Sequence, residues 1–111
     1  MRRLICFLAL LSGTAFAQAS HSVTLTWTAS TDTGGTVNVY KATSGCTGTP
    51  SFTLLASGVV SAGPYIDSTV GVGQFCYYVT AVVNGAESLP SNNAAATVLP
   101  KSPTSIKAVA Q

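Results

Sequence analysis

The side chains able to do acid–base chemistry are few in this sequence of 111 residues. The carboxylates Asp32, Asp67 and Glu87 are scattered, and the sequence places no two of them as an acid and base pair. His21 is the only histidine, so a Ser-His-Asp triad would have to use it. It lies near the N-terminus of the exported chain, where mobility works against a general base. We therefore predict no catalytic site and no enzyme activity.

The sequence also contains few residues that could bind a metal or a cofactor. The three cysteines are Cys6, Cys46 and Cys76, and no two of them have the Cys-x-x-Cys spacing of a redox pair. A zinc site needs more ligands than two thiols and one imidazole provide. The glycines in 71–73 precede a predicted strand rather than a helix, so they do not form a phosphate-binding loop. We expect neither a metal nor a cofactor.

The N-terminus has the three parts of a secretory signal peptide: Arg2 and Arg3, an apolar run over 4–11, and small residues ending at Ala17. We expect residues 1–17 to be removed, with cleavage after Ala19 as the alternative. The apolar run is too short to span a bilayer, which takes about 20 residues. Cys6 would be discarded with the signal. The predicted location is secreted, either extracellular or periplasmic.

Loss of the two arginines leaves three lysines against three carboxylates, and so no formal net charge. This composition excludes electrostatic binding of nucleic acid, which needs clustered lysine and arginine. It also excludes polybasic attraction to anionic membranes.

The mature chain alternates between apolar and polar residues, which is typical of half-buried strands. Turn residues separate the alternating segments, and Asn84-Gly85 is a strong tight-turn pair. No window shows a helical period. The expected strands are 23–28, 36–41, 52–55, 65–67, 75–83 and 92–99, with a connection over 57–64. This pattern predicts an all-β fold, a two-sheet antiparallel β-sandwich.

Five segments, taken in order, resemble a bacterial fibronectin type III domain: Ser22–Trp27, Val37–Lys41, Tyr65-x-Asp67, Gly73–Val82 and Glu87–Asn92. The resemblance covers about 21–100 and implies a fibronectin type III or immunoglobulin-like domain over 18–100. It also implies an inward-facing core. The predicted core residues are Val23, Leu25, Trp27, Val37, Val39, Phe75, Tyr77, Val79 and Ala81.

Two consequences of the resemblance concern local chemistry. The family usually has a tyrosine where this chain has Phe75, so either Tyr77 takes over its hydrogen bond or the bond is lost. The family's topology puts the start of the strand that carries Cys76 beside the end of the strand that Cys46 follows. The resemblance thus implies a structural disulfide between Cys46 and Cys76.

The family's first strand has no counterpart before Val23, yet the C-terminal residues 101–111 look like one. We call residues 101–111 the tail. It cannot return along the domain to pair with its own sheet, but it can continue into the vacant position of the next molecule. Head-to-tail homo-oligomers would result. The predicted donor residues are Pro103, Ile106, Ala108 and Ala110. The alternative is that the tail is an unordered remnant.

Tyr40 and Tyr78 should point outward on one sheet, near Asn38 and Thr80. Exposed tyrosines can stack on sugars or anchor a protein, and the other interpretation is a cross-strand pair that stabilises the sheet. Our leading hypothesis is a secreted, non-catalytic module for extracellular or cell-surface protein interaction that assembles head to tail. The alternative is a carbohydrate- or protein-binding accessory module that uses this tyrosine face.

Overall fold

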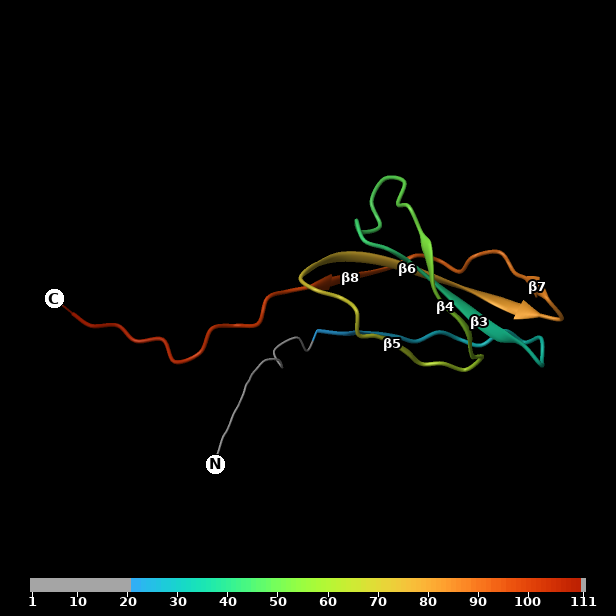
Figure 1. Ribbon diagram of the computed structural model, residues 1–111, viewed down its shortest axis with the longest axis horizontal. Coiled ribbons are helices and arrows are strands. Elements are labelled where there is room, and N and C mark those ends of the chain that lie inside the picture. Colours follow the sequence, from blue (N-terminus) through green and yellow to red (C-terminus); the bar gives the residue numbers. More distant parts are fainter. Residues whose placement is uncertain (1–20, 111) are drawn as a thin grey trace, which may run out of the picture.

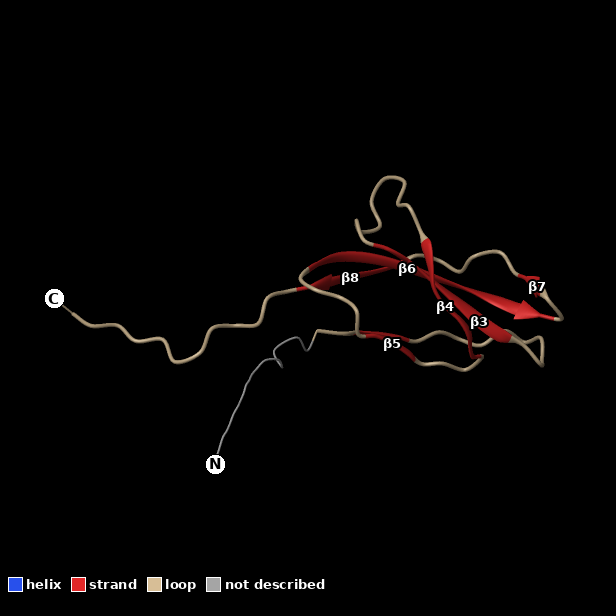
Figure 2. Ribbon diagram, in the orientation of Figure 1, coloured by secondary structure: helices blue, strands red, loops and turns tan. Residues whose placement is uncertain are grey.

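The computed structural model describes residues 21–110, and the predicted signal peptide, Cys6 included, lies outside them. Strands make up 43% of this part and no helix occurs in it (Figures 1 and 2). It therefore contains no helix that could cross a membrane. The strands are β2 (Val23–Leu25), β3 (Thr36–Ala42), β4 (Thr53–Val60), β5 (Tyr65–Asp67), β6 (Gly73–Val83), β7 (Ala86–Glu87) and β8 (Ala94–Val98).

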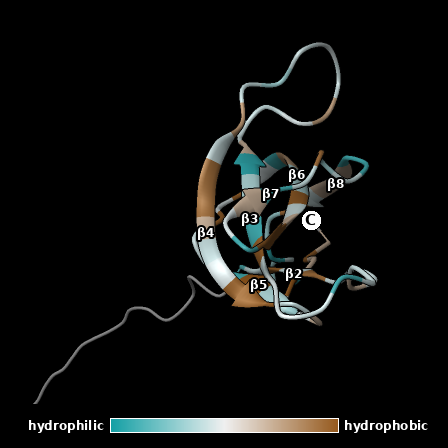
Figure 3. Cartoon of the chain, turned by 90° about the vertical axis from the view of Figure 1, so that its right-hand side faces the viewer, coloured by the Kyte–Doolittle hydropathy of each residue, from teal (hydrophilic) through white to brown (hydrophobic). Residues whose placement is uncertain are grey.

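The strands form two antiparallel sheets, which confirms the predicted all-β sandwich. The smaller sheet pairs β2 with β5, and the larger has the order β4-β3-β6, with both β7 and β8 on the other edge of β6. Figure 3 shows β2 and β5 as one layer below the curved layer of the other strands. β4 follows one side of the sandwich down towards β5. On the opposite side β8 and β2 are neighbours in space without a ladder between them.

The centre of the larger sheet is the ladder between β3 and β6, in continuous register from Thr36↔Val82 to Ala42↔Cys76. Alternation along β3 buries Val37 and Val39 and leaves the side chains between them on the outer face. This is the period-2 arrangement that the sequence predicts, produced by β-branched residues on the pleated inner face.

The hairpin after β6 turns at Asn84 and Gly85, both with positive φ (52° and 78°), as a type I′ turn requires. The short strand β7 was not predicted. Between β7 and β8, Ser88 and Ser91 keep the chain on the edge of β6, because their hydroxyls accept hydrogen bonds from the backbone N–H groups of Ala81 and Val79. These serines explain how the return strand continues past Pro90, which has no N–H to donate.

The prediction of a connection over 57–64 was wrong, because β4 continues to Val60. Val37 pairs with Val59 and Val39 with Ala56, so three steps on β4 oppose two on β3. Gly58, at φ 67°, supplies the left-handed backbone that such a bulge needs. The bulge lets the strand pass through a segment that looked like a loop.

Two other predicted strands were too long. The first ends at Leu25 instead of 28, because its partner β5 begins at Tyr65, and Trp27 instead donates its indole N–H to the carbonyl of Ser61 at 2.8 Å. The last strand spans Ala94–Val98 rather than 92–99, since the hydroxyl-mediated contact at Ser91 precedes the regular ladder.

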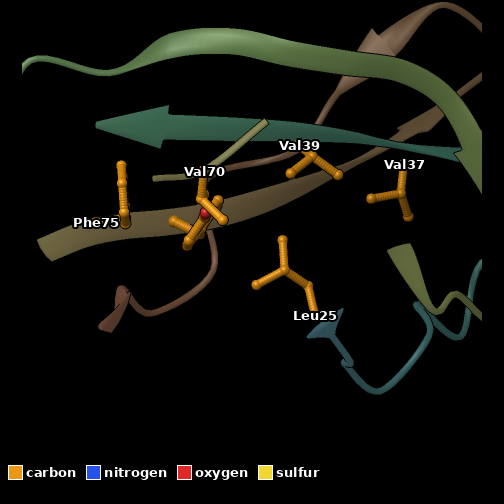
Figure 4. Packing of buried hydrophobic residues seen from close by; sticks show 6 residues of the cluster. Leu25, Val37, Val39, Val70 and Phe75 are labelled. Atoms are coloured by element: carbon orange, nitrogen blue, oxygen red, sulfur yellow. The ribbon is translucent and has the colours of Figure 1, made fainter. Parts of the chain in front are cut away.

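The core lies between the two sheets and consists of Leu25, Val37, Val39, Val70, Phe75 and Tyr77 (Figure 4). Leu25 points from β2 towards β3 and β6. Val23, Trp27 and Val79 are half-buried against this cluster, as predicted for core positions. Ala81 is half-buried outside it. Val70 was missed because its Gly-rich surroundings looked like a turn.

Candidate functional site

The side of the sandwich between β2 and β8 is open. β2 pairs with β5 on one edge and with no other strand of residues 21–110 on the second edge. β8 pairs with β6 and likewise has a second edge without a ladder. A strand edge of this kind presents backbone N–H and C=O groups that can pair with another chain.

A groove follows this open side from one pole of the sandwich to the other, as three hollows. The first, about 490 Å³, lies between His21–Val23 and Ala96–Leu99. The second, about 320 Å³, lies between Leu25–Thr28 and the start of β8. The third, about 220 Å³, lies between Trp27–Ser30 and 88–91. We call the end at His21 and Leu99 the tail pole, and the end at Ser30 and Leu89 the far pole.

The floor of the groove is apolar and belongs to the core. Val23, Leu25 and Trp27 face it from one sheet, and Ala96 and Val98 pack on the same cluster from the other. The ring of Trp27 lines both the second and the third hollow. A groove of this composition suits a strand that places small and branched apolar side chains inward.

The tail leaves β8 at the tail pole and runs away from the sandwich (Figure 1). Residues 101–110 form no strand and are exposed throughout. Ile106 is 94% and Val109 78% exposed, so two large apolar side chains have no partner within the described chain. Pro103, Ala108 and Ala110 are exposed as well. The four predicted donor residues therefore lie outside their own domain.

The predicted tyrosine pair lies on the outer face of the larger sheet. Tyr40 and Tyr78 are register partners, and their rings stack with centroids 4.7 Å apart. The ring of Phe52 packs at 4.6 Å from that of Tyr78. The Tyr78 ring thus contacts two neighbouring aromatic rings, and its stacking on Tyr40 is the arrangement of a stabilising cross-strand pair.

Glu87 binds the polar groups of this face. Its Oε2 atom accepts hydrogen bonds from the hydroxyls of Tyr40 and Thr80 and, at 3.4 Å, from the Asn38 amide. The bonds from Thr80 and Tyr40 lower the pKa of Glu87, and the bond to Glu87 raises the pKa of Tyr40. Thr80 is buried, so of the four predicted binding residues it is the least accessible. The sequence missed Glu87, although its place just after a tight turn opposite the tyrosines was a usable signal.

A second set of polar side chains, the buried polar cluster, consists of Lys41, Asp67, Thr69 and Tyr77. The Asp67 carboxylate is 1% exposed; its Oδ2 lies 2.8 Å from the Lys41 Nζ and accepts a hydrogen bond from the Tyr77 hydroxyl at 2.8 Å. Its Oδ1 accepts bonds from the N–H and hydroxyl of Thr69. Tyr77 therefore does not take over the predicted bond to the backbone, because its hydroxyl donates to the Asp67 carboxylate.

The charges in this cluster shift two pKa values. Burial raises the pKa of Asp67, but the bonds from Lys41, Thr69 and Tyr77 outweigh that effect and lower it to about 2. Burial, together with the bond to Asp67, raises the pKa of Tyr77. Lys41 also lies 5.0 Å from the ring centroid of Phe75. A carboxylate held this firmly in its charged form is a structural anion rather than a proton donor.

Cys46 and Cys76 form a disulfide with Cα atoms 4.9 Å apart, which confirms the predicted pair. Cys76 is fully buried beside the end of β3, and the bond fixes the loop that follows that strand.

The other candidate catalytic groups do not converge. Asp67 is buried in the interior, Glu87 lies on the outer sheet face, Asp32 is exposed at the far pole, and His21 lines the groove at the tail pole. No group of three potential metal ligands occurs within residues 21–110. Comparison with known proteins finds no matching family model, curated protein or solved structure.

Proposed function

We propose that this chain is a secreted, non-catalytic module of the fibronectin type III kind, which acts in extracellular protein interaction by assembling head to tail. Each copy donates its tail as a strand to the next copy. The observation that carries the proposal is the combination, in one chain, of a sheet with an open edge and an exposed apolar tail.

Export is supported by two features. Residues 1–17 have the composition of a cleavable signal, and the disulfide is of a kind that persists in oxidising compartments. The fibronectin type III assignment is supported by the five matching segments and by the strand order, in which β2 and β5 form one sheet and β4-β3-β6-β8 the other.

The polarity of the groove favours donation to another molecule. β2 begins at the tail pole and β8 ends there, so a strand antiparallel to β2 must enter at the far pole. The chain's own tail starts at the tail pole and would first have to cross the domain. Ten extended residues, as in 21–30, span roughly 30 Å, whereas the four residues 99–102 reach about 14 Å at most.

Folding back onto the free edge of β8 is also disfavoured. Pro100 and Pro103 cannot donate backbone hydrogen bonds, and they occupy the positions where such a hairpin would turn and begin pairing. A second copy placed end to end meets neither obstacle. The contact is heterologous and does not close, so it extends into a filament.

The alternative function, ligand binding at the tyrosine face, has weaker support. The Tyr40 hydroxyl donates to Glu87, and the Tyr78 ring stacks on Tyr40 and contacts the tilted ring of Phe52. A sugar would have to compete with these contacts.

The test is light scattering on the purified mature protein across a concentration series, beside a version that ends at Pro100. We expect the full chain to grow into larger species with concentration, and the truncated chain to stay monomeric with an unchanged far-ultraviolet β-sheet spectrum. Monomers in both samples at every concentration would refute the proposed function.

A further inference from the structure

We infer that the acceptor is the groove between β2 and β8 of the next copy, in one register: Ile106 against Trp27, Ala108 against Leu25, and Ala110 against Val23. This inference rests on the proposed function, and it specifies the surface and the side chains through which a second copy is recognised.

The spacing of apolar residues carries the register. In the segment that begins with β2, every second side chain points inward, at residues 23, 25 and 27. The tail repeats that interval at residues 106, 108 and 110. A tail that pairs antiparallel to this segment runs in the opposite direction, so Ile106 meets Trp27 and Ala110 meets Val23. The three inward positions of the tail then match the three inward positions of the acceptor over the same length.

Side-chain size supports this register at Trp27. Ala108 and Ala110 lie opposite Leu25 and Val23, which line the second and the first hollow. Ile106, the largest of the donor side chains, arrives beside Trp27, where the second and third hollows meet. A shift by two residues would bring Ala108 or Thr104 to this position in place of the larger Ile106.

The start of the tail fits the far pole. Pro103 enters near Ser30, where a residue without an N–H costs nothing because the ladder has not begun. Ser105 has φ 60°, so the chain bends just before Ile106. Lys101 of the donor then lies near Asp32, an exposed carboxylate at the far pole of the acceptor. The charges are complementary.

The opposite face of the tail provides a matched control. Val109 is apolar and exposed like Ile106, but it has the other parity and points to solvent in this register. Ile106→Lys and Val109→Lys therefore add the same charge to the same exposed segment, and neither touches the folded domain. We expect Ile106→Lys to weaken association about tenfold or more, because a side chain of this size loses its burial, and Val109→Lys to change it less than about threefold.

Cross-linking tests the register directly. The acceptor is a chain that ends at Pro100 and carries Val23→Cys, so it can receive a tail but not donate one. The donor is the full chain with Ala110→Cys or, as the shifted control, Ala108→Cys. Paired strand positions lie within disulfide reach, and positions two residues apart do not. We expect oxidation to link the acceptor to the Ala110→Cys donor and not to the Ala108→Cys donor.

The outcomes separate the two claims. A full chain that assembles through its tail, but loses association equally with both lysine variants or links through position 108, overturns this register and leaves the proposed function standing. A full chain that remains monomeric at all concentrations overturns both. Selective loss with Ile106→Lys, together with the link at position 110, supports the register.

Discussion

The interior around Asp67 and the groove beside β2 lie in the same small sandwich but differ in whether their polar groups and strand edges have partners. In the interior, the oxygens of a buried carboxylate accept bonds from Lys41, Thr69 and Tyr77, and the disulfide joins the adjoining loop to β6. In the groove, core residues lie beneath two strand edges without partners in the described chain.

This difference separates two uses of the sequence. The interior specifies the fold by satisfying every charge that it buries, which a small domain with a limited core requires. In the proposed assembly, the groove receives the tail of another copy. We therefore expect substitutions in the interior to remove both folding and assembly, and substitutions in the groove or tail to remove assembly alone.

The largest expected effect follows from Asp67→Ala. The substitution leaves the Lys41 ammonium, whose side chain is 11% exposed, without its counter-ion. Breaking a buried pair in this way costs about 3–5 kcal/mol, so we expect urea unfolding to show a strongly destabilised or unfolded domain.

The matched control is Asp32→Ala, which removes the same charge from an exposed position at the far pole. It should change the free energy of unfolding by less than about 0.5 kcal/mol. Equal effects from the two substitutions would mean that the buried polar cluster does not hold the fold.

Removal of the disulfide comes next. Cys46 and Cys76 are separated by 30 residues, and the chain-entropy treatment assigns closure of such a loop about 3–4 kcal/mol. We expect the double variant Cys46→Ala/Cys76→Ala, and the wild type under reducing agent, to unfold at clearly lower urea concentration. An unchanged midpoint would show that the loop is held by packing alone.

Changing the pH should have a smaller effect on stability, and the pKa shifts fix its direction. The pKa of Asp67 falls from its ordinary 3.8 to about 2, so its contribution to stability is complete above pH 4 and is lost as the pH falls through 2. The loss amounts to about 2 kcal/mol. The pKa of Tyr77 is raised, so its contribution is present below pH 10 and is lost at higher pH.

Urea unfolding from pH 5 down to 1.5 measures the acid window, with Asp67→Asn as the reference. The difference between the two proteins should shrink steadily as the acid increases. A difference independent of pH would contradict the assignment of this charge to the closed interior.

The same contrast explains what could be predicted from the sequence. Alternation predicts β3, β5 and β6 well, because each is a continuous ladder whose alternate residues face the core. It fails at β4, where the bulge at Gly58 depends on the partner strand, and at Val70, whose burial depends on the packing of the two sheets. Periodicity within one segment does not report either contact.

The candidate sites divide in the same way. The disulfide and the tyrosine pairing follow from strand topology, and the topology was predicted. The roles of Lys41 and Glu87 were not, because each side chain is defined by partners at least seven residues away and on other strands. The groove itself was implied only by the expectation that no strand precedes Val23.

The tyrosine face tests whether the outer surface belongs to the stable interior or to the binding groove. We expect Tyr78→Ala to lower the free energy of unfolding by about 1 kcal/mol and to leave assembly unchanged, since aromatic pairs contribute on that order. A double-variant cycle with Tyr40→Ala, read by urea unfolding, isolates the stacking contribution. Loss of assembly with an unchanged unfolding curve would instead move this face to the interaction surface.

The smallest effect concerns the charges at the far pole. In the inferred register Lys101 of one copy approaches Asp32 of the next, and exposed pairs of this kind contribute about 0–1 kcal/mol. Lys101→Asp and Asp32→Lys should each weaken association a few-fold at low salt, and the double variant should recover most of the loss. At high salt, screening should make the strength of association the same for all four proteins. Both residues are exposed and lie outside the core, so the unfolding curves of the variants should coincide. If the double variant did not recover association, the contact of Lys101 would lie elsewhere on the far pole.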